Sequence, residues 1–262
     1  MNRLTFDIVD DIATITLKHP PQNRVDDRMV DELNEAVEAI ENLGARAVLL
    51  QADGDNFCFG GDIQLWPDNP VSQLRARFER YLAVFNRFER LPMPVVAAVQ
   101  GICLGGGFEL ALRADVIFAG ADATFGHPEQ TLGIVTLLGG IYRVAERAGR
   151  ARASEWALNS KPVSASEMRQ SGVVNRVIAE GDLHREAREF VRSLARGPTR
   201  AYAAHKALLR AWSIGGIAAA DEVMLDIAMP LFDTDDVRAG IKSAVDALRA
   251  GKPRPALHFT GQ

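Results

Sequence analysis

The sequence predicts an α/β protein in which parallel strands alternate with helices and a helical C-terminal segment follows. Hydrophobic residues make up 47% of the 262 residues and charged residues 24%, as in ordinary globular proteins. Up to about residue 120, short apolar runs alternate with stretches of helical periodicity. This rhythm is typical of parallel strands joined by crossover helices.

The first elements follow from local patterns. Leu4–Val9 and Ile12–Lys18 are rich in β-branched residues and are separated by two aspartates, which predicts a hairpin. Residues 27–42 carry apolar side chains at helical spacing and predict a helix. Residues 47–50 form a short apolar run that predicts a buried strand, and a long loop through Gly61 follows.

The same alternation continues through the middle of the chain. Helical spacing over 72–90 predicts a helix that stops at a Pro-Met-Pro sequence. The apolar run Val95–Val99 predicts a strand, and a glycine-rich turn then leads into a short helix near Phe108–Leu112. Residues 116–119 predict one more strand.

The last part of the chain is mainly helical. The dipeptide Gly197-Pro198 marks a predicted division into a core over 1–197 and a helical segment over 198–262. One strand is predicted at 173–178, and helices are predicted at 140–148, 151–158, 164–170, 183–195, 200–212, 217–229 and 235–250.

Composition and missing motifs exclude several functions. The net charge is −4 without a charged tail, so nucleic-acid binding or binding to an anionic membrane is not expected. Two cysteines are too few for a disulfide framework or a cysteine-rich metal site, and no metal is expected. No signal peptide or membrane span is predicted, which favours a cytoplasmic location. The hydrolase elbow, the zinc helix motif, the phosphate loop and the dinucleotide-binding turn are all missing.

Two glycine-rich turns each follow a predicted buried strand, at 57–63 and 101–110. In the second turn, three glycines stand directly before a helix, where backbone N–H groups have no partner within the helix. Such N–H groups can hold an oxyanion. The alternative interpretation is that the glycines only permit tight turns or close packing.

Two glutamates lie in apolar surroundings. Glu109 begins the helix after the second glycine turn, and Glu129 precedes another apolar stretch. Burial raises the pKa of a carboxyl group and so suits it to proton transfer near neutral pH. The alternatives are a helix N-terminal charge for Glu109 and a capping or ion-pair role for Glu129.

The order and spacing of these segments resemble those of the crotonase (enoyl-CoA hydratase/isomerase) superfamily. The resemblance rests on 57–63, on 101–110 and on the Phe-Gly-His-Pro-Glu sequence at 125–129 with the glycine pair at 139–140. It extends to 20–25 and 236–249. It implies a crotonase-like fold of repeated ββα units with a C-terminal helical segment. It also implies a homotrimer, often paired into a hexamer, with the C-terminal helices at the subunit contacts.

The resemblance implies a site as well. In this superfamily, two backbone N–H groups bind the carbonyl of an acyl-CoA thioester, and by position these belong to Gly61 and Gly106. Hydratases use two glutamates, matched by Glu109 and Glu129, whereas isomerases generally need only the second. An enoyl-CoA hydratase is therefore predicted, with no cofactor apart from the CoA of its substrate. The alternatives are a Δ3,Δ2-enoyl-CoA isomerase, another acyl-CoA enzyme of this fold, and a catalytically silent acyl-CoA-binding or RNA-associated homologue.

The acyl-CoA contacts are predicted to be mainly backbone contacts. The lysines that some members direct at CoA phosphates are replaced by Asp55 and Gln64. Arg24 is the alternative cation, and a solvated arginine is the other interpretation. His127 is interpreted as a packing or hydrogen-bonding residue. The residues predicted to contact the substrate are Asn23, Arg24, Val25, Phe59, Gly60, Asp62 and Gly105.

Overall fold

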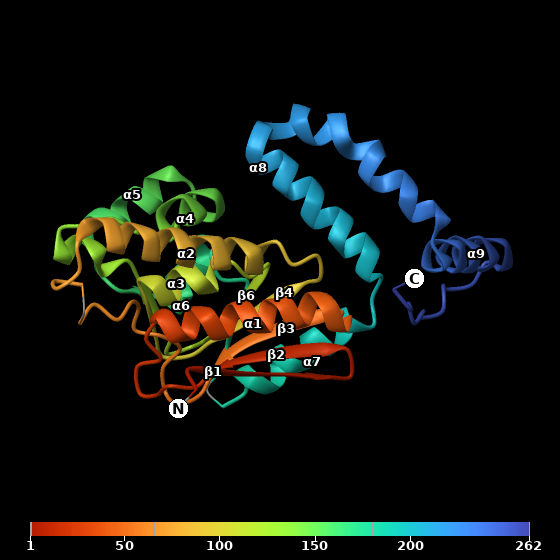
Figure 1. Cartoon of the computed structure of the whole chain (residues 1–262). Helices are drawn as coiled ribbons and strands as arrows, with labels where there is room; N and C mark the ends of the chain where they lie inside the picture. Colours follow the sequence, from red (N-terminus) through yellow and green to blue (C-terminus); the bar gives the residue numbers. More distant parts are fainter. Residues whose placement is uncertain (1, 65, 180, 262) are drawn as a thin grey trace.

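The protein, seen here in a computed structural model that describes residues 2–64, 66–179 and 181–261, has a mixed α/β body and a helical arm (Figure 1). The main sheet begins with an antiparallel hairpin, and its other neighbouring strands are parallel. This confirms the α/β prediction. The six strands, in spatial order, are β1 (Leu4–Val9), β2 (Ile12–Leu17), β3 (Ala47–Ala52), β4 (Val95–Val99), β6 (Val116–Gly120) and β9 (Arg176–Ile178).

A second, smaller sheet was not predicted. It contains β5 (Ile102–Leu104), β7 (Thr124–Gly126) and β8 (Val163–Ser164). Strands of two or three residues are too short to show an alternating pattern, so the sequence carries no signal for them. Their importance is positional, because β5 and β7 lie directly before the two segments that carry the glutamates.

The strand predicted at 173–178 is wrong in its first half. The backbone N–H groups of Val173 and Val174 both donate to the carbonyl oxygen of Met168, at 2.9 and 3.1 Å. These bonds close a turn behind α6 (Ala165–Gln170), and only the last three residues, in β9, pair with β6. The two valines are buried, which explains the strand-like apolar run.

Helices α1 (Asp27–Leu43), α2 (Val71–Glu89) and α3 (Gly106–Ala111) contribute to a single large hydrophobic core on one face of the main sheet. In α1, the side chain of Asp26 accepts a hydrogen bond from the Met29 N–H and so caps the helix. The helix ends at Gly44, which has a φ of 74°. The buried stripe is Met29, Val30, Leu33, Ala36, Val37 and Ile40.

Helix α7 (Leu183–Ala195) covers the opposite face of the sheet. Alternate residues of β4 therefore face two different cores, with Val95, Ala97 and Val99 on one side and Val96 and Ala98 on the other. This double burial explains why β4 is a continuous apolar run rather than an alternating one. Between β7 and β9 lie η1 (Pro128–Leu132), α4 (Gly140–Ala148), α5 (Arg150–Asn159), β8 and α6.

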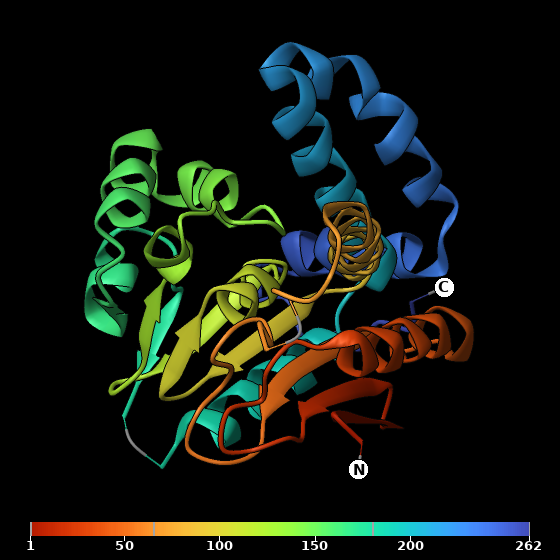
Figure 2. The same cartoon turned by 60° about the vertical axis from the view of Figure 1, so that its left-hand side comes forward.

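The chain ends in an arm that extends from the body (Figures 1 and 2). It consists of α8 (Thr199–Ala228), η2 (Met229–Asp233) and α9 (Asp235–Ala250). Non-helical torsions at Gly215 and Gly216 break α8, where two helices were predicted. Lys206 fastens the first half of α8 to the body through the carboxylate of Asp115 and the carbonyl of Met93, at 2.7 and 3.0 Å. The domain division and the trimer contacts remain predictions.

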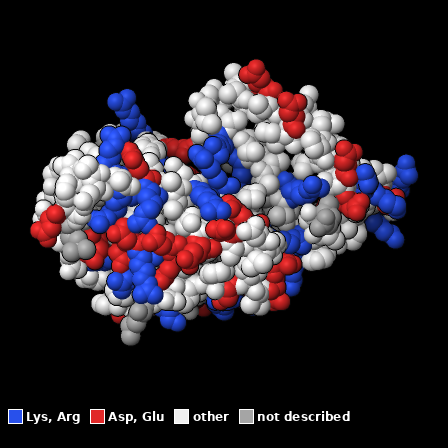
Figure 3. All heavy atoms as spheres, in the orientation of Figure 1, with Lys and Arg blue, Asp and Glu red and all other residues white. Residues whose placement is uncertain are grey.

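The surface of the body mixes charges of both signs, as Figure 3 shows for one face. Part of this pattern is a network between α1 and α2, in which Arg80 contacts Asp27 and Asp31. In the part of the chain that the structure describes, no helix is both long enough and apolar enough to cross a membrane.

Candidate active site

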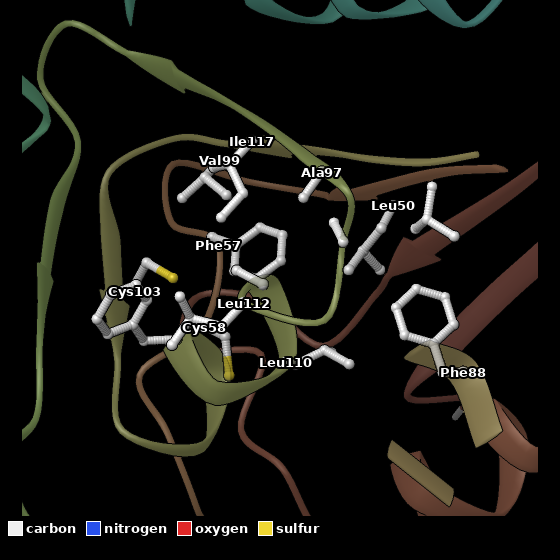
Figure 4. Packing of buried hydrophobic residues seen from close by; sticks show 14 of the residues in the cluster. Leu50, Phe57, Cys58, Phe88, Ala97, Val99, Cys103, Leu110, Leu112 and Ile117 are labelled. Atoms are coloured by element: carbon white, nitrogen blue, oxygen red, sulfur yellow. The ribbon is translucent and has the colours of Figure 1, made fainter. Parts of the chain in front are cut away.

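The two glycine turns lie side by side. Cys58, in the first turn, pairs with Cys103 of β5 in a parallel bridge. The Cys58 N–H donates to the carbonyl of Ile102 at 3.0 Å, and the Leu104 N–H donates to the carbonyl of Cys58 at 2.9 Å. Both cysteines are fully buried beside α3 (Figure 4). They therefore belong to the hydrophobic support of the site.

Glycine at position 107 allows α3 to approach the first turn. A Cβ at Gly107 would lie 2.4 Å from the Cβ of Cys58, far inside van der Waals contact. Gly60 is needed for a different reason, because its φ of 100° is accessible mainly to glycine. The packing role that the sequence left open for these glycines is therefore present, and it brings the two turns together.

The N–H groups of Gly61 and Gly106 lie close to each other. A Cβ at Gly106 would be 3.6 Å from the Gly61 nitrogen. The first group is fixed by Val25, whose N–H donates to the Gly60 carbonyl at 2.9 Å and whose carbonyl accepts from the Asp62 N–H at 2.8 Å. Within the described ranges, neither glycine nitrogen donates a hydrogen bond. Both donors are thus free for a ligand.

Glu109 is buried with a defined orientation. Its side chain projects from α3, the residue is 2% exposed, and its Oε1 accepts hydrogen bonds from the N–H groups of Leu138 and Gly140 at 2.8 and 2.9 Å. Burial, and secondly the charge of Glu129, raise the pKa of Glu109 to about 7. A carboxyl group with this pKa can take up and release a proton near neutral pH.

Glu129 lies on the other side of the glycine turn. It belongs to η1, and its side chain is 12% exposed. Its Oε1 would be 3.0 Å from a Cβ at Gly105, so this oxygen lies over the second turn. Its Oε2 is buried and has no hydrogen-bond partner among the described residues. Burial raises the pKa of Glu129 as well.

A buried arginine that the sequence analysis did not single out supports the Glu109 pocket. The Arg113 side chain is fully buried and donates to the carbonyl of Leu138 at 2.5 Å. It also donates to Glu89 Oε2 at 2.8 Å, and Arg143 binds the same carboxylate. The Leu138 N–H in turn binds Glu109. The sequence signal for this residue is its position between the mainly apolar stretches 108–112 and 116–118, because arginines are rarely buried unless they are paired.

Two of the side chains predicted to contact substrate already form hydrogen bonds within the protein. Asn23 is buried, and its amide holds the neighbouring loops by donating to the carbonyls of Asp53 and Asn56 at 3.0 and 2.9 Å. Asn23 Oδ1 accepts from the His19 N–H at 2.7 Å, so its polar atoms are used within the protein. Asp62 accepts from the Gln64 N–H at 3.2 Å. Substrate contacts by these two residues remain predictions.

Arg24 is held by the protein at the edge of the site. It donates to Gln22 Oε1 at 2.7 Å and to the carbonyl of Gly61 at 3.2 Å. Its guanidinium lies 6.0 Å from the centre of the Phe59 ring. We therefore expect Arg24→Ala to raise the KM for an acyl-CoA less than about tenfold, or about 1.4 kcal/mol. Steady-state kinetics with Arg28→Ala as an exposed control would check this, and complete loss of binding would contradict it.

His127 is buried beside Glu129, with its Nδ1 3.8 Å from Glu129 Oε2, and is described further below. The described ranges contain no group of three or more His, Cys, Asp or Glu side chains arranged to hold a metal ion. The polar groups that converge on the glycine turns are therefore two backbone donors, two carboxyl groups and one imidazole. This combination can stabilise a negative oxygen and move protons beside it.

A comparison with protein families identifies the family of this chain. A family model described as enoyl-CoA hydratase/isomerase matches residues 7–249. The chain belongs to the enoyl-CoA hydratase/isomerase family. Members of this family act on acyl-CoA thioesters, which agrees with the crotonase resemblance of the sequence.

Individual relatives of this family member differ in their named reactions. It is 36% identical to the mevalonyl-coenzyme A hydratase SIDH of Beauveria bassiana over 78% of this chain and 77% of the relative. It is 33% identical to the 1,2-epoxyphenylacetyl-CoA isomerase of Escherichia coli over 72% of this chain and 74% of the relative. A solved structure named as enoyl-CoA hydrates subunit I from Geobacillus kaustophilus superposes with a TM-score of 0.89 at 30% identity, covering 99% of this chain and 98% of the other. The crotonase fold is thus shown.

Proposed function

We propose that this family member is an enoyl-CoA hydratase, which adds water across the α,β double bond of an acyl-CoA thioester. The observation that carries this proposal is the pair Glu109 and Glu129, two buried carboxyl groups with raised pKa values beside the free N–H groups of Gly61 and Gly106. Isomerisation needs one proton-transferring carboxyl group in this family. Hydration uses two, because water must lose one proton while the α-carbon gains another.

The chemistry follows from where charge develops. As the water oxygen bonds to C3, the π electrons move toward the thioester and the carbonyl oxygen becomes an enolate. The two N–H groups bind this oxygen, and loss of one such donor typically costs about 10²- to 10³-fold in rate. One carboxylate takes the proton from water. The other carboxyl group gives a proton to C2, and the enolate electron pair forms the new C–H bond as the carbonyl is restored.

The two roles are not divided between the glutamates by geometry alone. The charge of Glu129 helps to raise the pKa of Glu109, so the two groups titrate as a pair. Such a pair predicts a bell-shaped dependence of kcat/KM on pH, since the reaction needs one protonated and one ionised carboxyl group.

A panel of CoA thioesters tests the proposal. Purified protein is incubated separately with 2-enoyl-CoA and 3-enoyl-CoA substrates of several chain lengths, and the products are identified by mass spectrometry. Formation of 3-hydroxyacyl-CoA from a 2-enoyl-CoA supports hydration. Movement of the double bond without a gain in mass of one water molecule would assign isomerisation instead. Acyl-CoA binding without turnover would assign a silent homologue.

The position of the thioester gives a structural prediction. In a crystal structure with an acyl-CoA, we expect the thioester oxygen to lie about 2.7–3.1 Å from both the Gly61 and Gly106 nitrogens, the range for oxyanion donors. A bound thioester in an active enzyme whose oxygen points away from both nitrogens would contradict this mechanism. The glycine turns would then serve only the packing described above.

A further inference from the structure

His127 is a buried polar residue to which the proposed chemistry assigns no role. It lies between β7 and η1 and is 3% exposed. One side of its ring faces Phe108, with ring centres 4.9 Å apart. Its edge meets Gly140, where a Cβ would lie 2.3 Å from His127 Cε1 and 2.9 Å from Glu109 Cγ. The imidazole is therefore part of the wall on which both glutamates lie.

Three buried polar atoms meet here without partners in the described part of the chain. They are both ring nitrogens of His127 and Oε2 of Glu129. His127 Nδ1 is 3.8 Å from Glu129 Oε2, which is too long for a hydrogen bond. Leaving a buried polar group unpaired costs about 1–3 kcal/mol. A donor and an acceptor that face each other at this distance can pair after a small rotation of either side chain.

The charge state of His127 determines what such a bond would do. Burial lowers the pKa of His127 to about 4, so the ring is neutral at physiological pH and one nitrogen carries the hydrogen. Glu129 and His127 therefore do not form an ion pair. A neutral donor can orient a carboxylate without adding a positive charge that would hold it permanently ionised. Glu109 of α3 also lies beside the ring, and its carboxylate is fixed by its own backbone donors.

We propose that His127 is a positioning residue for the reaction, and that its Nδ1–H binds Glu129 Oε2 and thereby turns Glu129 Oε1 toward the reacting water. The inference rests on the proposed function, because it assigns Glu129 a proton-transfer role. Glu129 Oε1 already lies on the side of the second glycine turn, and Oε2 lies on the side of the imidazole. A misplacement of about 1 Å in a reacting group can cost about 10²-fold in rate.

Two variants of equal shape separate this role from simple packing. His127→Asn keeps a donor near the position of Nδ1, whereas His127→Leu has the same branched outline as Asn and no donor. We expect His127→Leu to lower kcat about 10- to 100-fold with little change in KM. We expect His127→Asn to retain kcat within about fivefold of the wild type, since the donor is kept. His205→Gln, at an exposed position on α8, serves as the matched control.

The pH profile provides a second kinetic readout. A hydrogen bond to a carboxylate lowers its pKa, so loss of the donor raises the pKa of Glu129. In His127→Leu, the limb of the kcat profile that Glu129 sets should therefore move to higher pH, and in His127→Asn it should stay near that of the wild type. Equal kinetic losses in the Leu and Asn variants, with unchanged pH profiles, would show a packing role and overturn the proposal.

A measurement on the wild-type enzyme remains decisive if His127→Leu does not fold. The ¹⁵N chemical shifts of the His127 ring, recorded with saturating 3-hydroxyacyl-CoA, report which nitrogen carries the hydrogen. A hydrogen-bonded Nδ1–H is expected, and a ring with its hydrogen only on Nε2 would overturn the proposal. If the wild type isomerises enoyl-CoA and does not hydrate it, the proposed function fails; the same measurement with the isomerised product then tests the His127–Glu129 bond by itself.

Discussion

Glu129→Gln and Glu109→Gln are each expected to lower kcat for hydration by about 10²- to 10⁴-fold, the range for loss of a general acid or base. Glutamine keeps the size of the side chain and removes its ability to accept or release a proton. Both residues are buried, so circular dichroism and thermal unfolding must show that the variants are folded. Steady-state kinetics with the preferred 2-enoyl-CoA gives the effect on kcat.

The same pair of variants distinguishes hydration from isomerisation. If Glu109→Gln retains wild-type activity while Glu129→Gln is inactive, the protein uses only the second carboxyl group and the isomerase alternative holds. Glu155→Gln on α5 is an exposed control that should behave as the wild type. Because the charge of Glu129 contributes to the raised pKa of Glu109, Glu129→Gln should also lower the pKa of Glu109.

The largest effect on stability is expected from Glu89→Gln, which should lower the free energy of unfolding by about 3 kcal/mol. Glu89 is the carboxylate shared by Arg113, whose side chain is fully buried, and Arg143. Removing its charge leaves Arg113 buried without an ionic partner. The value is at the lower end for a broken buried pair, because the Glu89 side chain is itself 34% exposed. Urea unfolding monitored by circular dichroism measures the change.

The pKa of Glu89 determines how this stabilisation changes with pH. Burial alone would raise the pKa of Glu89, but hydrogen bonds and charges from Arg143 and Arg113 outweigh it and lower the pKa. The stabilisation is therefore complete above the unfolded-state pKa of about 4.3 and is lost as the pH falls through the lower folded-state value. Glu79→Gln, on the same helix, breaks only the exposed pair with Arg75 and should cost less than about 1 kcal/mol. Equal costs for the two variants would contradict a special role for Glu89.

Long elements were predictable because their patterns repeat over several turns or strand residues. Helix α1 shows a buried stripe with an aspartate cap and a terminal glycine, and all three signals are local. β5 and β7 could not be predicted, because three residues carry too little pattern and their pairing depends on distant chain segments. The valines at 173 and 174 were misassigned because burial within a turn and burial within a strand produce the same apolar run.

The residues of the candidate site also differ in how well the sequence predicts them. The two glycine turns and the two glutamates lie in short contiguous motifs, so a family resemblance was enough to predict them. Arg113 and His127 act through contacts with Leu138 and Glu129, and a sequence does not show such contacts. Asn23 shows the reverse case, because it lies within a family motif while its side chain holds loops together.

The oxyanion donors belong to the main chain, and this makes them difficult to delete by mutation. A nucleotide change can replace Glu109 or Glu129 in one step, whereas an N–H group is lost only when proline is introduced. At Gly61 a side chain is limited by space, since a Cβ there would lie 3.3 Å from the Trp66 ring, whereas a Cβ at Gly106 would make an ordinary contact with Val25 at 3.5 Å. Single substitutions of the glutamates can therefore change proton transfer while the two N–H groups still bind the thioester oxygen. A chain of this construction can acquire a different reaction without first losing the ability to bind and polarise its substrate.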